Sequence, residues 1–217
     1  NSEFFLEYLP IISFLDEKCI GAEVLLRWKR FDELVPPLEI IPAIKNTPLI
    51  GLITYWMIEQ VGREMGDLLH SEEKIHIGIN APPELIGRGG IAYAIDKAGL
   101  LDVAHKLTLE ITERGLLDQT ALDAINARAL SCKIAVDDFG TGDANLLQLS
   151  KIEADVIKID KTSIGQITTD RWVSRMISGL SASASVLGTE LIAEGIESNT
   201  QVELLKRLGV SMGQGTF

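Results

Sequence analysis

Acidic side chains recur at the ends of apolar segments along the whole sequence. The clearest case is the segment 133–160, in which Asp137 and Asp138 follow one apolar run and Lys158 and Asp160 end another. Between the two runs lie a glycine-containing turn and a short helical pattern, so the segment predicts a strand–helix–strand unit. Charged groups at the carboxyl ends of parallel strands are typical of a functional site rather than of a core.

Further polar residues occupy the same position at the ends of other predicted strands. Taken singly, most of them would be explained by solvation, a salt bridge or a turn. Together they comprise six carboxylates, one lysine and two side-chain amides: Glu23, Asn80, Glu110, Asp137, Asp138, Lys158, Asp160, Glu194 and Gln214. In a parallel barrel they would converge on one rim, where crowded carboxylates raise one another's pKa or bind cations.

This set of donors indicates hard divalent cations. Oxygen ligands without cysteine or histidine spacing select Mg²⁺, Mn²⁺ or Ca²⁺ over zinc. Two such ions would offset most of the negative charge of the rim and let it accept a phosphodiester. Lys158 and Asp160 are two residues apart, so on a strand they face the same side, where Lys158 could orient or deprotonate a water. Asp137 and Asp138 both reach a metal only if the backbone turns there, as Gly140 and Gly142 would allow.

The elements that must position these residues alternate along the chain. We predict strands at 4–12, 21–28, 74–80, 107–113, 134–138, 156–160, 190–197 and 210–215, and helices at 36–69 with a break near Pro48, 91–98, 122–129, 146–152, 170–187 and 202–208. The tight turn between the first two strands favours antiparallel pairing. The pattern predicts an α/β fold, a (β/α)8 TIM-like barrel with an antiparallel first strand. Without a linker-like stretch, residues 1–217 are expected to form a single domain, excised from a longer multidomain protein.

The composition is that of an ordinary globular protein, with 46% hydrophobic and 24% charged residues. The net charge of −11 argues against a binder of DNA or RNA polymers but leaves open an anionic ligand held through metal ions. Cys19 and Cys132 form no motif, which favours a reducing compartment and a cytoplasmic domain. The longest apolar stretch, 49–58, is too short to span a bilayer. An inner-membrane anchor elsewhere in a full-length protein is left open.

Several segments in series resemble the motifs of EAL domains, bacterial cyclic di-GMP phosphodiesterases. The segment 21–28 (GAEVLLRW) is similar to the motif that names the family, with Val24 in place of its alanine. The later motifs follow in order and approximate spacing across essentially the whole chain: EITE at 110–113, DDFGTG at 137–142, KID at 158–160, AEGIE at 193–197 and QG at 214–215. We interpret the chain as a member of this family.

The resemblance implies a mechanism and a role for each site residue. It implies two Mg²⁺ or Mn²⁺ ions that activate the attacking water, with linear pGpG as the product, and Ca²⁺ as an inhibitory substitute. The implied metal ligands are Glu23, Asn80, Glu110, Asp137, Asp138 and Glu194. Lys158 would hold the water and is catalytic together with Glu23 and Glu194. Arg27, Asp160 and Gln214 would serve the substrate side, and Glu113 would anchor the loop 139–146.

Three departures from the family pattern bear on substrate binding more than on the metal site. The family's usual Tyr-Gln-Pro is Tyr8-Leu9-Pro10, the segment 40–45 ends in Lys45 where an acid is usual, and Asp143 begins a variant loop. They keep two alternatives open: a non-catalytic cyclic di-GMP receptor and a protein-interaction module with an inert barrel. The resemblance also implies a homodimer and allows an N-terminal sensor domain. Small residues in the helix 170–187 permit close helix packing, most simply against the barrel.

Overall fold

The computed structural model describes residues 3–45, 47–86, 89–113, 123, 125, 130–140 and 153–216, without the side chains of Leu38 and Glu84. Its strands are β1 (Phe4–Ser13), β2 (Cys19–Arg30), β3 (Glu33–Val35), β4 (His76–Asn80), β5 (Leu107–Thr112), β6 (Lys133–Phe139), β7 (Val156–Ile159), β8 (Glu190–Ile196) and β9 (Met212–Gly215). Its helices are α1 (Pro37–Ile44), α2 (Leu49–Ser71), α3 (Pro83–Ile86), α4 (Gly90–Lys97), α7 (Lys161–Gln166), α8 (Arg171–Leu187) and α9 (Asn199–Arg207), with a 3-10 turn at Ala104–Lys106. The predicted helix 146–152, and 122–129 apart from two residues, lie outside the described ranges.

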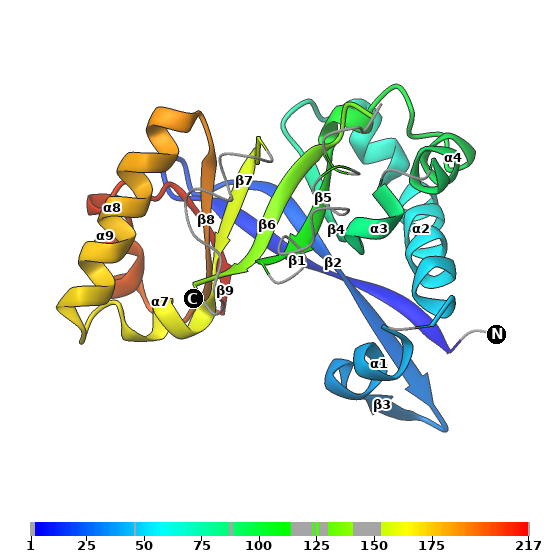
Figure 1. Cartoon of the computed structure of the whole chain (residues 1–217), viewed down its shortest axis with the longest axis horizontal. Coiled ribbons are helices and arrows are strands. Elements are labelled where there is room, and N and C mark those ends of the chain that lie inside the picture. The colour runs from blue at the N-terminus through cyan, green and yellow to red at the C-terminus, as the bar shows by residue number, and fades with distance from the viewer. Residues whose placement is uncertain are drawn as a thin grey trace.

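Eight strands close into a barrel, which confirms the predicted fold (Figure 1). The ring runs β1-β9-β8-β7-β6-β5-β4-β2, and β2 pairs again with β1. β1 is antiparallel to both of its neighbours, whereas the remaining pairs of the ring are parallel. The short strand β3 lies outside the ring, antiparallel to the end of β2, and was not predicted from the sequence.

The reversal between β1 and β2 is made by a turn at residues 14–18. Ser13 N donates to Lys18 O at 2.9 Å, Glu17 N donates to Ser13 O at 3.0 Å, and Glu17 adopts a left-handed φ of 57°. The register then pairs Leu9 with Glu23 and Phe5 with Arg27. Because β1 runs opposite to the other strands, its amino-terminal half lies at the rim where their carboxyl ends meet.

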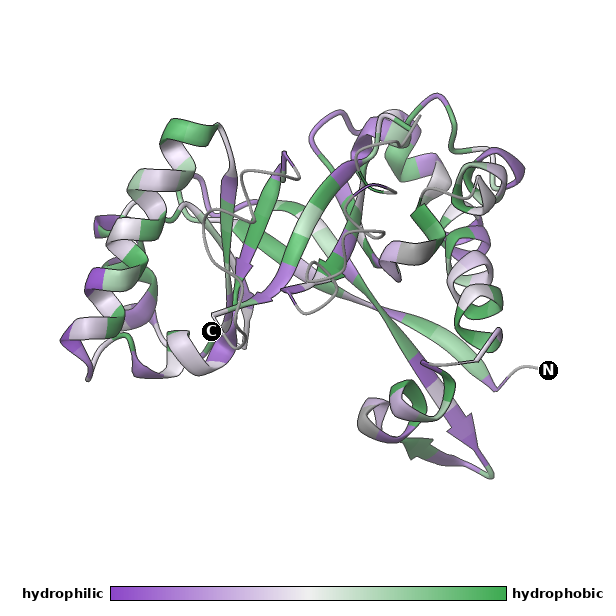
Figure 2. Cartoon of the chain, viewed as in Figure 1, coloured by the Kyte–Doolittle hydropathy of each residue, from purple (hydrophilic) through white to green (hydrophobic). Residues whose placement is uncertain are grey.

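The strands of the barrel are apolar on both faces because helices cover the outside and side chains fill the inside. Helices α2 and α4 pack together on the side of β4, and α7, α8 and α9 lie against β8 (Figure 1). The hydropathy colouring follows this division, with apolar residues along the barrel strands and alternating character along α8 and α9 (Figure 2).

An apolar layer fills the barrel interior one step below the predicted site. It consists of Ile11, Ala135, Val156 and Ile192, with Ile20 and Met212 packed against it. Ala135, Val156, Ile192 and Met212 each precede a predicted site residue by two positions. Since side chains two apart on a strand face the same way, the site residues point into the barrel directly above this layer.

Candidate functional site

Lys158 lies at the centre of the site and is only 1% exposed. Its Nζ lies 2.8 Å from Glu23 Oε2, 2.9 Å from Glu110 Oε2, 2.8 Å from Glu194 Oε1 and 3.2 Å from Asp137 Oδ1. These four acids come from β2, β5, β8 and β6, so the closed ring brings together residues that are up to 171 positions apart. The structure therefore brings Lys158 and the four acids together at one rim of the barrel, as the sequence predicted.

The cluster contains more negative charge than its lysine can neutralise. An ammonium group has three protons, and here four carboxylates surround it. Asp137 Oδ1 is buried and makes no hydrogen bond, although Lys158 Nζ is 3.2 Å away. A buried carboxylate oxygen without a donor is costly unless a cation completes its surroundings. The residues present therefore fit a bound metal ion.

Two side-chain amides donate hydrogen bonds to the carboxylates. Gln214 Nε2 donates to Glu23 Oε2 at 2.7 Å and to Glu194 Oε1 at 2.8 Å, and it thereby joins β9 to both β2 and β8. Asn80 Nδ2 donates to Glu23 Oε1 at 3.2 Å. Glu23 thus receives donors on both oxygens, which fixes the plane of its carboxylate.

The backbone turns at Asp138, as the simultaneous use of both aspartates requires. Asp138 has a φ of 57°, and the β6–β7 register is irregular between Val136 and Phe139. Carboxylate oxygens of Asp137, Asp138 and Glu194 consequently lie within 4.8 Å of one another. Three carboxylates gathered in this way could bind one divalent cation. We expected the following glycines to provide the turn, and Gly140 does have a φ of 104°, but Asp138 itself already leaves the strand geometry.

The electrostatics of the site follow from burial and from Lys158. Burial raises the pKa of Glu110 to about 8 and that of Glu194 to about 7, against the attraction of Lys158. Burial would also raise the pKa of Glu23, but Lys158 outweighs it and the pKa is lowered. Burial opposes the charge of Lys158, but the surrounding carboxylates raise its pKa well above the ordinary value. Lys158 is therefore a cation at neutral pH, suited to orienting a water rather than to deprotonating one.

The other predicted site residues lie around this core. Asp160 caps α7, its Oδ1 accepting from Thr162 N at 2.8 Å, and its charge contributes to raising the pKa of Asp138, after burial and Asp137. Glu113 Oε2 accepts from Gly140 N at 3.0 Å, at the start of the loop it was predicted to anchor; residues 141–146 lie outside the described ranges. Arg27 lies further along β2 and its Nε donates to Glu7 Oε2 at 2.5 Å.

The comparisons with known proteins agree with this geometry. The sequence matches the EAL domain family over residues 1–217. The chain belongs to the EAL domain family. It is 32% identical over 220 residues to the probable cyclic di-GMP phosphodiesterase PdeB of Escherichia coli K12, with 99% of this chain and 42% of PdeB covered.

Solved structures extend the likeness of this EAL domain to its fold. The EAL enzyme Bd1971, in a form bound to cAMP and cyclic di-GMP, superposes with a TM-score of 0.89 at 31% identity, covering 99% of this chain and 61% of that one. The MucR phosphodiesterase in complex with cyclic di-GMP superposes with a TM-score of 0.86 at 29% identity, covering 98% and 89%. The chain spans less than half the length of PdeB, so this EAL domain corresponds to one part of that relative.

Two residues of the EAL domain with consequences for the site were not selected from the sequence. A Cβ on Gly78 would clash with Glu110 Oε1, so this glycine makes room for the Glu110 carboxylate. Glu7 was overlooked because its contact with Arg27 depends on the β1–β2 register. The signal available in the sequence was a single acid within the alternating inward positions Phe5, Glu7, Leu9 and Ile11.

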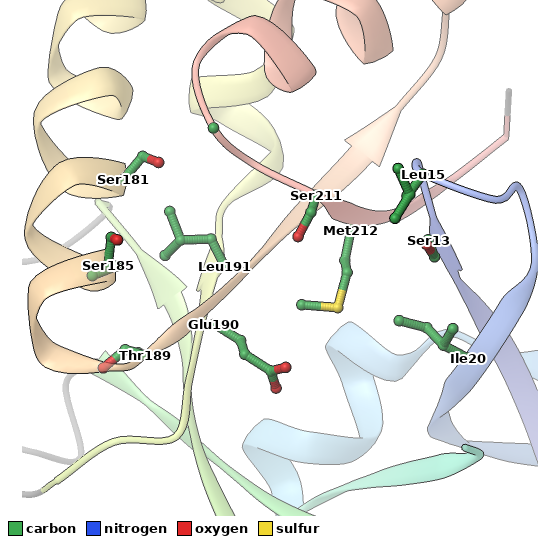
Figure 3. Close-up of a pocket in the computed structure, with 12 residues that line it drawn as sticks. Ser13, Leu15, Ile20, Ser181, Ser185, Thr189, Glu190, Leu191, Ser211 and Met212 are labelled. Atoms are coloured by element: carbon green, nitrogen blue, oxygen red, sulfur yellow. The ribbon is translucent and has the colours of Figure 1, made fainter.

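A pocket of about 400 Å³ lies at the opposite end of the EAL barrel, between α8 and the turn after β1 (Figure 3). Serine hydroxyls and apolar side chains line it, among them Ser181, Ser185, Leu191 and Met212. Its carboxylate, Glu190, pairs with Lys133 at 3.1 Å. None of the predicted site residues lines this pocket. Over the described ranges, no helix has both the length and the apolar character needed to cross a membrane.

Proposed function

We propose that this EAL domain is a metal-dependent phosphodiesterase that hydrolyses cyclic di-GMP to linear pGpG. The observation that carries the proposal is the buried Lys158 among Glu23, Glu110, Asp137 and Glu194, an overcharged oxygen site that fits divalent cations. Support for the substrate comes from the names of the relatives and from the cyclic di-GMP bound to the similar structures.

In this proposal Glu23, Asn80, Glu110, Asp137, Asp138 and Glu194 hold two Mg²⁺ or Mn²⁺ ions. When bound, these ions would lower the pKa of water and stabilise the charge that develops on the phosphate. Lys158 keeps its proton and holds the attacking water by hydrogen bonds. Gln214 fixes the orientation of Glu23 and Glu194, and Asp160 supports the neighbouring Asp138. Arg27 receives a phosphate of the substrate, and Glu113 fixes the start of the loop after β6.

Incubation of the domain with cyclic di-GMP and Mn²⁺, followed by chromatography of the nucleotides, tests the proposal. We expect linear pGpG with Mn²⁺ or Mg²⁺, and none with Ca²⁺. The Lys158→Ala variant is expected to bind cyclic di-GMP but not to hydrolyse it. If the wild-type domain yields no pGpG with Mn²⁺, the hydrolase assignment is wrong. Binding of intact cyclic di-GMP with equal affinity in EDTA and in Mg²⁺ would then identify a receptor, and a lack of nucleotide binding would identify a protein-interaction module.

We further propose that residues 1–217 act as one domain of a longer chain that also carries a sensor domain, and that the domain forms a homodimer. The greater length of PdeB supports the first point. For the second, Trp172, Met176 and Val186 form an exposed apolar row at heptad spacing along α8, with the exposed Gly179 and the partly exposed Ser183 between them. A second copy of α8 fits such a face. Light scattering of the wild type and of Trp172→Glu tests this: a monomeric wild type would exclude the dimer.

A further inference from the structure

We propose that Glu7 sets the affinity of this domain for its phosphodiester by holding the guanidinium of Arg27. The inference rests on the proposed function, in which Arg27 receives a phosphate of the substrate. In this inference Glu7 competes with the phosphate, which must displace it from Arg27. Glu7 therefore determines affinity without taking part in the chemistry.

The β1–β2 ladder places the two side chains on the inward face at the rim. Glu7 pairs with Leu25 and Phe5 pairs with Arg27, so Glu7 and Arg27 are diagonal neighbours. Alternation along β2 puts Arg27 on the same face as Glu23. A phosphate held by Arg27 would therefore lie above the carboxylate cluster and on the same side of the sheet.

Glu7 occupies the part of the guanidinium that a phosphate needs. Nε of Arg27 donates to Glu7 Oε2 at 2.5 Å, and Nη1 donates to Leu26 O at 3.1 Å. A guanidinium binds an oxyanion most strongly through two parallel N–H groups on one edge. Because Nε already donates to Glu7, the guanidinium edge that includes Nε cannot bind the phosphate through two parallel N–H groups. The carboxylate also cancels the charge that would attract the anion.

The exposure of the pair favours competition over a purely structural role. The Glu7 side chain is 50% exposed and that of Arg27 is 21% exposed, so Glu7 can swing into solvent while Arg27 remains in place. Leu26 O already orients the guanidinium, and hence Glu7 is not needed for that purpose. Across the described ranges, Arg27 is the cation that pairs with Glu7.

The test compares Kd for cyclic di-GMP, measured by calorimetry in EDTA and in Ca²⁺, with KM and kcat measured in Mn²⁺. Replacing the charge in Glu7→Gln is expected to lower both Kd and KM by about two- to fivefold, because exposed ion pairs of this kind contribute up to about 1 kcal/mol. The value of kcat is expected to stay unchanged. The matched control is Glu3→Gln, which removes a carboxylate from the same edge where it accepts from Trp28 Nε1 at 3.1 Å, and it is expected to leave Kd unchanged.

A double-mutant cycle identifies Arg27 as the route of the effect. Arg27→Gln alone is expected to weaken binding about tenfold or more. In that background, Glu7→Gln is expected to change Kd less than twofold. An equal gain in both backgrounds would mean long-range repulsion of the phosphate, and weaker binding by Glu7→Gln would mean that Glu7 orients Arg27. Either result overturns the proposal, as does an unchanged Kd.

The outcome is separable from that of the proposed function. If the wild type binds cyclic di-GMP without hydrolysing it, the hydrolase assignment fails while the Kd cycle still decides the role of Glu7. If hydrolysis occurs and Glu7→Gln leaves Kd and KM unchanged, only the present inference fails. A domain that does not bind cyclic di-GMP at all would overturn both.

Discussion

At the scale of single residues, the site depends on one ammonium group that lies among three buried carboxylates and the partly buried Glu194. Lys158 supplies the countercharge when no metal ion is bound, and its four acidic neighbours would otherwise repel one another. Without a metal ion, Lys158 thus keeps these four acids together. This role can be measured apart from turnover.

Lys158→Met is expected to lower the free energy of unfolding in EDTA by about 3–5 kcal/mol, because it leaves the carboxylates of the cluster without a countercharge. Added Mn²⁺ is expected to restore more stability to this variant than to the wild type, since the cation replaces the lost charge. Urea denaturation with and without Mn²⁺ measures both effects. The control is Lys106→Met, which removes a second buried lysine that donates to Leu69 O at 2.6 Å, far from the carboxylates. Equal rescue of both variants by Mn²⁺ would contradict the role given to Lys158.

Gly78 provides a second residue-level test. Gly78→Ala is expected to displace the Glu110 carboxylate, because the new methyl group would overlap Glu110 Oε1. Turnover and Mn²⁺ affinity should fall about tenfold or more, because the glycine no longer leaves room for the proposed ligand Glu110, while circular dichroism remains that of the folded domain. Gly66→Ala, at a buried position in α2 with no atom within 4 Å of the added carbon, is the control and should keep full activity. Wild-type Mn²⁺ affinity in Gly78→Ala would show that Glu110 is not a ligand.

At the scale of elements, the strand ends and the helix caps share residues with the site. Asp160 directly follows β7 and caps α7, and its charge raises the pKa of Asp138, so one side chain has a structural task and an electrostatic effect on the proposed site. The two tasks can be separated because asparagine caps helices as well as aspartate does.

Asp160→Asn is expected to retain the stability of the wild type, whereas Asp160→Ala should lose about 1 kcal/mol through the missing cap. Both variants should lose turnover if the charge of Asp160 supports the site. Thermal denaturation and the rate of pGpG release measure the two effects. An active Asp160→Asn variant would reduce Asp160 to a capping residue.

The elements also show why part of the site was predictable from the sequence and part was not. Lys158 and Glu194 were recognisable because each lies near the end of a strand, two positions after an apolar inward residue, Val156 or Ile192. The left-handed φ of Asp138 was not predictable, since only a small fraction of non-glycine residues adopt one and the following glycines offered a simpler explanation. Contacts such as Glu7 with Arg27 depend on strand register, which local patterns do not determine.

At the scale of the whole molecule, the barrel closes through its shortest ladder. β1 and β9 share two residue pairs, at Ile12 and Ser13, whereas β4 and β5 share four. Gln214 reinforces this closure, because its amide reaches across β1 to Glu23 on β2. The hydrogen bond from Gln214 to Glu23 therefore links the closure of the barrel to the carboxylate cluster.

Amide exchange is expected to be faster for Gly213 in β9 than for Ile79 in β4, because fewer ladder bonds must break for β9 to open. Gln214→Ala should accelerate exchange at Gly213 and leave Ile79 unchanged. Exchange monitored by NMR resolves the two amides. Uniform exchange across both strands would show that the closure is no weaker than the rest of the ring.

The reversed direction of β1 also determines where the proposed sensor domain would attach. Glu3 and Phe5 lie beside Trp28 and Arg27, so the amino-terminal end of β1 is at the rim of the site instead of at the far end of the barrel. A domain joined ahead of residue 3 would therefore be tethered next to the proposed phosphate-binding residue Arg27. Its rotation would pull on β1 and move Glu7 relative to Arg27 before it disturbed any carboxylate. Such a connection would change the affinity for the phosphodiester while the proposed catalytic groups stayed in place.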